Sequence, residues 1–179
     1  MTQTSQDFKG KFNIKTGDTI LAFLFFASIG LTVWAISIYR LTIIDIKYLF
    51  AASALGAIIA LTIILIRRKS TYSIIWTFII SVASGAGLFY FGLLYLNQAF
   101  ADKETLTEEL QIIKTGNLGR GRKSRCFQPY AVVDFHGTQK QLVFYCEYEK
   151  TIKDYSKVTV NYSRGLFGFD IIKSKQLTQ

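Results

Sequence analysis

Long uncharged apolar runs alternate with short charged segments over the first hundred residues of the chain. The longest run, Tyr72 to Leu96, has 25 residues and contains no Asp, Glu, Lys, Arg or His. Because the hydrocarbon core of a bilayer needs about 20 apolar residues in a helix, this run predicts a membrane-spanning helix. Two further runs, from about Thr19 to Tyr39 and from about Tyr48 to Ile66, predict two more spans. We therefore expect a three-helix membrane region in residues 19–101, after a polar cytoplasmic tail of residues 1–18.

The first apolar run also resembles a cleaved signal peptide in its position. Its length exceeds that of a typical signal-peptide core, and no small-x-small cleavage site follows it. Asp18 and Thr19 can cap a helix that begins there, because a side-chain oxygen accepts a free backbone N–H. We therefore expect a retained helix.

After residue 102 the pattern changes to the alternation of a β-strand. Runs rich in β-branched and aromatic residues predict strands at residues 110–115, 130–135, 141–148, 157–162 and 166–172. Residues 136–139 and 163–165 read as hairpin turns, and residues 149–156 as one helical turn. The fold class expected is an α+β membrane protein: three transmembrane helices, then a soluble all-β domain of residues 102–179. That domain is a small antiparallel barrel or roll of about five strands.

Lysines and arginines near the span ends predict the orientation. Six of them fall on the side of the N-terminal tail and the second turn, and four fall on the other side. Cytoplasmic loops carry an excess of Lys and Arg, so the N-terminus is expected inside and the β domain outside the cytoplasm. The six are Lys9, Lys11, Lys15, Arg67, Arg68 and Lys69, and the four are Arg40, Lys47, Lys103 and Lys114.

Composition excludes several function classes. The net charge of +9 is spread evenly, with eight basic and three acidic residues in 1–96 and 13 and nine in 97–179, so we expect no nucleic-acid partner. The single histidine, His136, is expected in a solvated turn, and a histidine-based metal site or catalytic triad is hard to build. No ionisable residue lies deep in a span, which argues against a pump or coupled transporter. We expect no enzyme activity, metal or cofactor.

Small residues recur at helical spacing in two of the spans. Such faces let helix backbones approach closely, which drives packing in lipid. Two alternatives stay open: packing among the three helices of one chain, or a face that recruits a partner or a second copy. The residues are Ala52, Gly56 and Ala60 in the second span, and Ser81, Gly85, Ala83 and Gly87 in the third.

A glycine-rich basic segment, Gly116 to Ser124, resembles a phosphate-binding loop. Arg122 intrudes before Lys123, and the residues after it do not start a helix, so nucleotide binding is not expected. The segment is either a plain loop between strands or a contact for lipid phosphates or an anionic partner. The basic residues of that second alternative are Arg120, Arg122, Lys123 and Arg125.

The two cysteines, Cys126 and Cys146, both lie in the β domain. Their spacing of 20 excludes a Cys-x-x-Cys redox motif or zinc knuckle. If the hairpin pairs about Gly137 and Thr138, Cys146 lies opposite Pro129 or Tyr130, within a short bend of Cys126. Outside the cytoplasm a disulfide persists. We expect a disulfide; the alternative is two thiols in a small core.

Three motifs of the tail carry a resemblance. The segments QPYAVVDFHG (128–137), KVTVNY (157–162) and GLFG (165–168) resemble the β domains of uncharacterised small bacterial multi-pass membrane proteins, over about 70 residues. The resemblance implies a membrane-attached module and carries over no catalytic residue.

We therefore expect a multi-pass protein of the cytoplasmic (inner) membrane of a bacterium. Its β domain would act as a binding module or as an accessory subunit of an envelope assembly. The expected partners are the lipid bilayer and a protein partner or second copy in the membrane. The alternatives are a membrane enzyme acting on lipid or envelope substrates, and a small channel or transporter.

Overall fold

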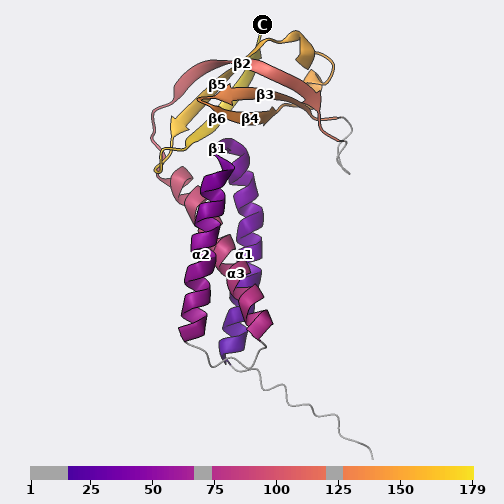
Figure 1. Ribbon diagram of the computed structural model, residues 1–179. Helices are drawn as coiled ribbons and strands as arrows, with labels where there is room; N and C mark the ends of the chain where they lie inside the picture. The colour runs from indigo at the N-terminus through magenta and orange to yellow at the C-terminus, as the bar shows by residue number, and fades with distance from the viewer. Residues whose placement is uncertain (1–15, 67–73, 120–126) are drawn as a thin grey trace, which may run out of the picture.

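Three antiparallel helices form a bundle with a curved β-sheet at one end (Figure 1). The computed structural model describes residues 16–66, 74–119 and 127–179. The helices are α1 (Thr16–Leu41), α2 (Ile46–Ile66) and α3 (Ile74–Ala99). All three are long and apolar enough to cross a membrane. The expectation of three such helices is confirmed, with ends that differ from the expected ones by up to three residues.

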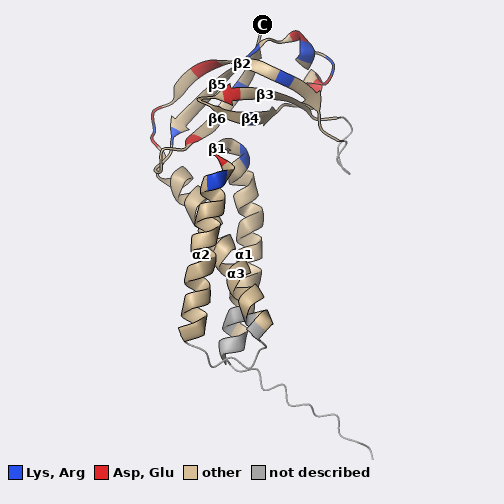
Figure 2. Ribbon diagram, in the orientation of Figure 1, with Lys and Arg blue, Asp and Glu red and all other residues tan. Residues whose placement is uncertain are grey.

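Charged residues are confined to the ends of the helices (Figure 2). The helices turn apolar side chains outward, including Phe23, Phe26, Leu55 and Ile58, each more than half exposed. In water such an exposed surface is unfavourable, whereas in hydrocarbon it is not.

Six antiparallel strands form one sheet in the order β1-β6-β5-β2-β3-β4. The sheet curls into a nearly closed barrel above the helix ends (Figure 1). The strands are β1 (Thr42–Ile43), β2 (Leu106–Asn117), β3 (Pro129–Phe135), β4 (Thr138–Val143), β5 (Lys157–Arg164) and β6 (Asp170–Thr178).

One strand comes from the helical region. The sequence predicted about five strands, all after residue 102, but β1 lies in the connection between α1 and α2 and pairs with β6. The short connection that we expected there is thus part of the barrel. Two residues are too few to show an alternating pattern, so this strand is visible only through its partner.

Several strand ends also differ from expectation. The β3–β4 turn is only two residues long, and both His136 (φ 51°) and Gly137 (φ 84°) have positive φ, as in a type I′ turn. Strand β4 ends at Val143, and the expected single helical turn is replaced by two 3-10 turns, η1 (Cys146–Tyr148) and η2 (Ile152–Asp154). Strand β6 begins at Asp170, because residues 165–169 form the turn before it.

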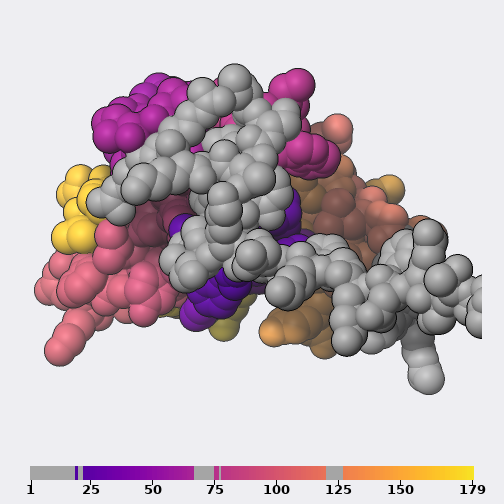
Figure 3. Space-filling view, turned by 90° about the horizontal axis from the view of Figure 1, so that it is seen from below, coloured from indigo at the N-terminus to yellow at the C-terminus, as the bar shows by residue number. Residues whose placement is uncertain are grey.

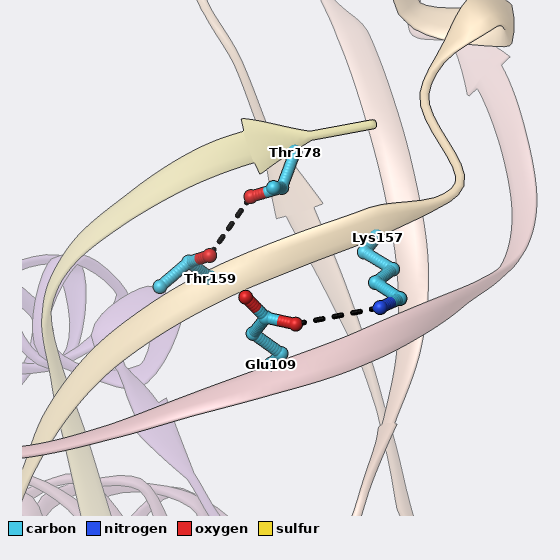
Figure 4. A network of polar contacts seen from close by, with 4 residues as sticks. All are labelled: Glu109, Lys157, Thr159 and Thr178. Carbon is cyan, nitrogen blue, oxygen red and sulfur yellow. Dashed lines mark hydrogen bonds and ion pairs between the residues drawn. The ribbon is translucent and has the colours of Figure 1, made fainter.

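The barrel has an apolar interior and a polar outer face. The buried interior includes Leu110, Val133, Phe135, Leu142, Ile152, Val158 and Val160. On the outer face of β2, β5 and β6, Lys157 Nζ contacts Glu109 Oε2 at 3.4 Å, and the hydroxyls of Thr159 and Thr178 are 2.8 Å apart (Figure 4). Inward and outward positions alternate along these strands, as the period-two pattern requires.

Candidate functional site

The helix ends and the barrel meet in a buried contact region, which we call the junction. It is formed by the end of α1, β1, the start of α2 and the last turn of α3 on one side. On the other side are β4, β6 and the β5–β6 turn. Its contacts decide how the barrel is held relative to the bundle.

The first contact of the junction is the β1–β6 pairing. Thr42 is opposite Ile171, and Ile43 is opposite Asp170. Ile43 belongs to the barrel core, whereas the next residue, Ile44, packs with buried residues of the helices. Successive side chains of an extended segment point to opposite sides, so this short strand joins the two cores.

The second contact is the ammonium group of Lys140 on β4. Its Nζ donates hydrogen bonds to the carbonyls of Tyr39 (2.8 Å) and Thr42 (2.6 Å), and it lies 4.4 Å from the centre of the Tyr39 ring. The Tyr39 carbonyl is one of the last four in α1, which have no partner within the helix. A cation at a helix C-terminus is also favoured by the helix dipole. Lys140 therefore fastens the free edge of the barrel to α1.

Lys140 and Lys175 are two lysines that point into the barrel. Lys140 is 8% exposed, and Lys175 lies over the ring of Phe144 at 5.3 Å. Burial, and next the charge of Lys175, lower the pKa of Lys140 to about 8, and burial lowers the pKa of Lys175. An ammonium removed from water loses hydration, so the neutral form is favoured. The two carbonyls that accept hydrogen bonds from Lys140 favour its charged form and therefore oppose this lowering of the pKa.

The third contact is Asn97, in the last turn of α3. Its side chain is fully buried; Nδ2 donates to the Phe169 carbonyl (2.9 Å), and Oδ1 accepts from the Phe167 amide (3.0 Å). A Cβ on Gly165 would collide with the Asn97 side chain. Glycine is therefore needed in this turn so that Asn97 can approach the backbone.

A cluster of ionisable side chains lies inside the barrel and at its rim. Glu108 Oε2 is 3.3 Å from His136 Nε2. Burial raises the pKa of Asp170, which the nearby Arg164 and His136 oppose. Burial, then the charges of Glu108 and Asp170, raise the pKa of Tyr162. A carboxylate beside an imidazole is the kind of pair that can move a proton.

An open hollow of about 230 Å³ lies between the helices near the junction. Its lining is mostly apolar and includes Tyr39, the residue whose carbonyl binds Lys140. The other lining residues are Ile46, Leu49, Phe50, Ser53 and Tyr90.

The predicted small-residue faces lie at helix contacts within the chain. A Cβ on Gly85 would meet the Gly56 carbonyl and, at 2.7 Å, the Ala60 Cβ, so these residues lie where α2 crosses α3. A Cβ on Gly87 would meet Thr32 Oγ1 of α1 at 2.8 Å. Ser81 is fully buried, whereas Ala52 and Ala83 are half-buried. The alternative, that one of these faces recruits a partner or a second copy, stays a prediction.

Most of the predicted basic and cysteine positions lie outside the described residues. These are Arg120, Arg122, Lys123, Arg125 and Cys126. The expected register of Cys146 was wrong, because the turn is at His136 and Gly137. The Phe144 amide donates to the Pro129 carbonyl (2.8 Å), and this register, continued to Cys146, would reach Phe127 rather than Pro129 or Tyr130. The disulfide with Cys126 stays a prediction.

Sequence reasoning missed both Asn97 and Lys140. Lys140 shares its inward position with Leu142, two residues on, and an inward lysine in a strand is a signal of a buried charge. Asn97 is a polar residue at the end of an apolar run, which is a common place for a capping or linking side chain. Neither sequence feature indicates which backbone groups these side chains bind.

Within residues 16–66, 74–119 and 127–179, no group of three or more His, Cys, Asp or Glu residues is arranged to hold a metal ion. Comparisons with protein-family models, with curated proteins and with solved structures find no match to this chain.

Proposed function

We propose that the protein is a three-span membrane protein that presents its β barrel on the outer side of a bacterial inner membrane. The barrel acts as a binding module or as an accessory subunit of an envelope assembly. The orientation follows from the excess of Lys and Arg near the opposite ends of the spans.

One observation carries this proposal: the barrel is fastened to the helices at three separate places. These are the β1–β6 pairing, the Lys140 contacts and the Asn97 contacts. A domain on a flexible linker loses conformational entropy when it binds a partner. A domain that is already held in one orientation loses less. A fixed mount close to the bilayer suits binding to a partner that is itself in or on the membrane.

Affinity purification in mild detergent tests the proposal. We expect a co-purifying protein in a fixed ratio to the wild-type chain. The Asn97→Ala variant, which removes two side-chain hydrogen bonds between α3 and the β5–β6 turn, is expected to recover less of it. Asn161→Ala, which removes hydrogen bonds on the outer face to Thr107 and Ser174, is the matched control. Failure to recover any partner, with or without prior cross-linking in the membrane, would contradict the proposal.

A second candidate is a membrane enzyme acting on lipid or envelope substrates. The observation that favours it is the contact between Glu108 and His136, close to Asp170 with its raised pKa. Under this alternative, lipid co-purifies and is turned over, and Glu108→Gln abolishes turnover without changing the recovery of any protein. A Glu108→Gln variant with unchanged turnover would remove this candidate.

A further inference from the structure

The turn between β5 and β6 lies level with the ends of the helices. The Leu166 amide donates to the Asn97 carbonyl (3.3 Å), and the Phe167 amide donates to Asn97 Oδ1 (3.0 Å). Asn97 is two residues before the end of α3, which is about 3 Å along the helix axis. The turn is thus held at the C-terminal end of α3.

Helix α2 also contacts this turn, through the first turn of the helix. The rings of Phe169 and Tyr48 are 5.3 Å apart, and Tyr48 lies in the first turn of α2. Phe169 also packs against the buried cluster at the helix ends, whose members include Leu49 and Leu94. Two helices therefore place residues 165–169 where the apolar spans end.

The turn exposes large apolar side chains at this height. Leu166 is 53% exposed and Phe167 is 47% exposed, and Phe100, which follows α3, is 64% exposed. We call these three residues the tip. On α3 itself, Tyr95 and Leu96 are also exposed, at 43% and 40%. Seen from the helix side, the barrel extends beyond the bundle, and yellow atoms of its C-terminal strands face the viewer beside the helices (Figure 3).

We propose that the tip is a lipid-contacting surface, which inserts into the boundary between headgroups and acyl chains of the leaflet on the barrel side. Large apolar and aromatic side chains are favoured at that depth, where apolar area leaves water without crossing the bilayer. The insertion gives the barrel its own contact with the bilayer, in addition to its mount on the helices. This inference rests on the proposal that the helices span a membrane.

Fluorescence quenching in vesicles made with brominated phosphatidylcholine tests the tip directly. Trp34 and Trp76 are both replaced by Phe, and Phe167→Trp supplies the single reporter. Leu166→Trp in the same background repeats the measurement at the neighbouring position. The matched control is Ile113→Trp, which is 55% exposed but lies on β2, the strand that runs over the barrel away from the helices (Figure 1). A positive control keeps Trp34, which lies on α1 and is 56% exposed.

We expect the tip reporters to be quenched about as strongly as Trp34, and at least about twofold more strongly than Ile113→Trp. Quenching at the tip no stronger than at Ile113→Trp, with Trp34 quenched, would overturn the inference and leave the spans intact. Protection from brominated lipid at Trp34 itself would refute the membrane-spanning bundle, and the inference with it.

Discussion

Asn97 and Lys140 are buried polar residues whose partners are backbone groups far away in the sequence. Asn97 binds the backbone 70 and 72 residues later, and Lys140 binds carbonyls 98 and 101 residues earlier. Every residue has a carbonyl group, so such partners leave no trace in the sequence. These two side chains nevertheless decide how the barrel sits on the helices, because a buried polar group must keep its partner.

Removal of the Asn97 side chain is expected to destabilise the junction. Asn97→Ala leaves the Phe167 amide without its acceptor and removes one of the two donors to the Phe169 carbonyl, which costs roughly 1–3 kcal/mol. Asn161 also makes two side-chain hydrogen bonds, but on the exposed face, so Asn161→Ala is expected to cost less than about 1 kcal/mol. Thermal unfolding in detergent measures both. Equal losses in the two variants would show that Asn97 does not hold the turn.

The lowered pKa of Lys140 predicts a pH dependence. The pKa is about 8 in the folded protein against 10.5 in an exposed lysine, so in this window the unfolded chain binds more protons. Stability due to Lys140 therefore rises as pH increases from about 8 towards 10.5. The thermal midpoint of the wild type, minus that of Lys140→Met, is expected to increase between pH 8 and pH 9.5. A difference that stays constant or falls would exclude this protonation change.

At the scale of elements, close helix contacts depend on single glycines. A Cβ at Gly85 would collide with the Gly56 carbonyl, whereas a Cβ at Gly92 on the same helix has nothing within 4 Å. Gly85→Ala is therefore expected to cost about 1–3 kcal/mol, because the helices must move apart. Gly92→Ala is expected to be neutral or to stabilise by up to about 1 kcal/mol, from helix propensity alone. The measurement is the thermal midpoint in detergent; a similar loss in both variants would place Gly85 away from a tight contact.

The expected disulfide also acts at this scale. A bridge between Cys126 and Cys146 closes a loop of about 20 residues and should stabilise the barrel by roughly 3 kcal/mol. The thermal midpoint should fall by the same amount in four cases, since each removes the same bond. These are reduction of the full chain, Cys126→Ser, Cys146→Ser and the double variant. Labelling of thiols after denaturation without reductant is the direct check. Two reactive thiols per chain would mean that no bridge exists.

The elements that the sequence predicted well are those with a long repeating pattern. Each helix has about 20 uncharged residues, so small errors at its ends do not hide it. Strands β3 and β5 alternate over seven and eight residues and were found close to their true ends. Strand β1 has two residues, and the turn at 165–169 contains Leu166 and Phe167, which looked like strand residues because they are apolar. Tertiary contacts with Asn97 determine the turn, and a local pattern does not contain them.

At the scale of the whole molecule, the barrel and the helices are joined by a shared strand and by buried contacts. The barrel takes β1 from the α1–α2 connection, and its free edge is held by Lys140 against the end of α1. Residues 102–179 alone would lack strand β1. They would also lack Asn97 and the carbonyls of Tyr39 and Thr42 that bind Lys140. For this reason each stability measurement above uses the full chain.

The shared sheet also constrains the topology. Because β1 pairs with β6, the α1–α2 connection and the barrel must lie on the same side of any membrane that the helices cross. The starts of α1 and α3 then lie on the opposite side. In the sequence, the six basic residues counted for that side directly precede these two helices. A reporter fused to the barrel can therefore show on which side of the membrane the barrel lies.

The most direct measurement fuses a dual reporter after Gln179 in growing bacterial cells. One half is a fluorescent protein that matures only in the cytoplasm, and the other is a phosphatase that folds only outside it. With the barrel outside, we expect phosphatase activity without fluorescence. Fluorescence without phosphatase activity would place the barrel in the cytoplasm and contradict the account.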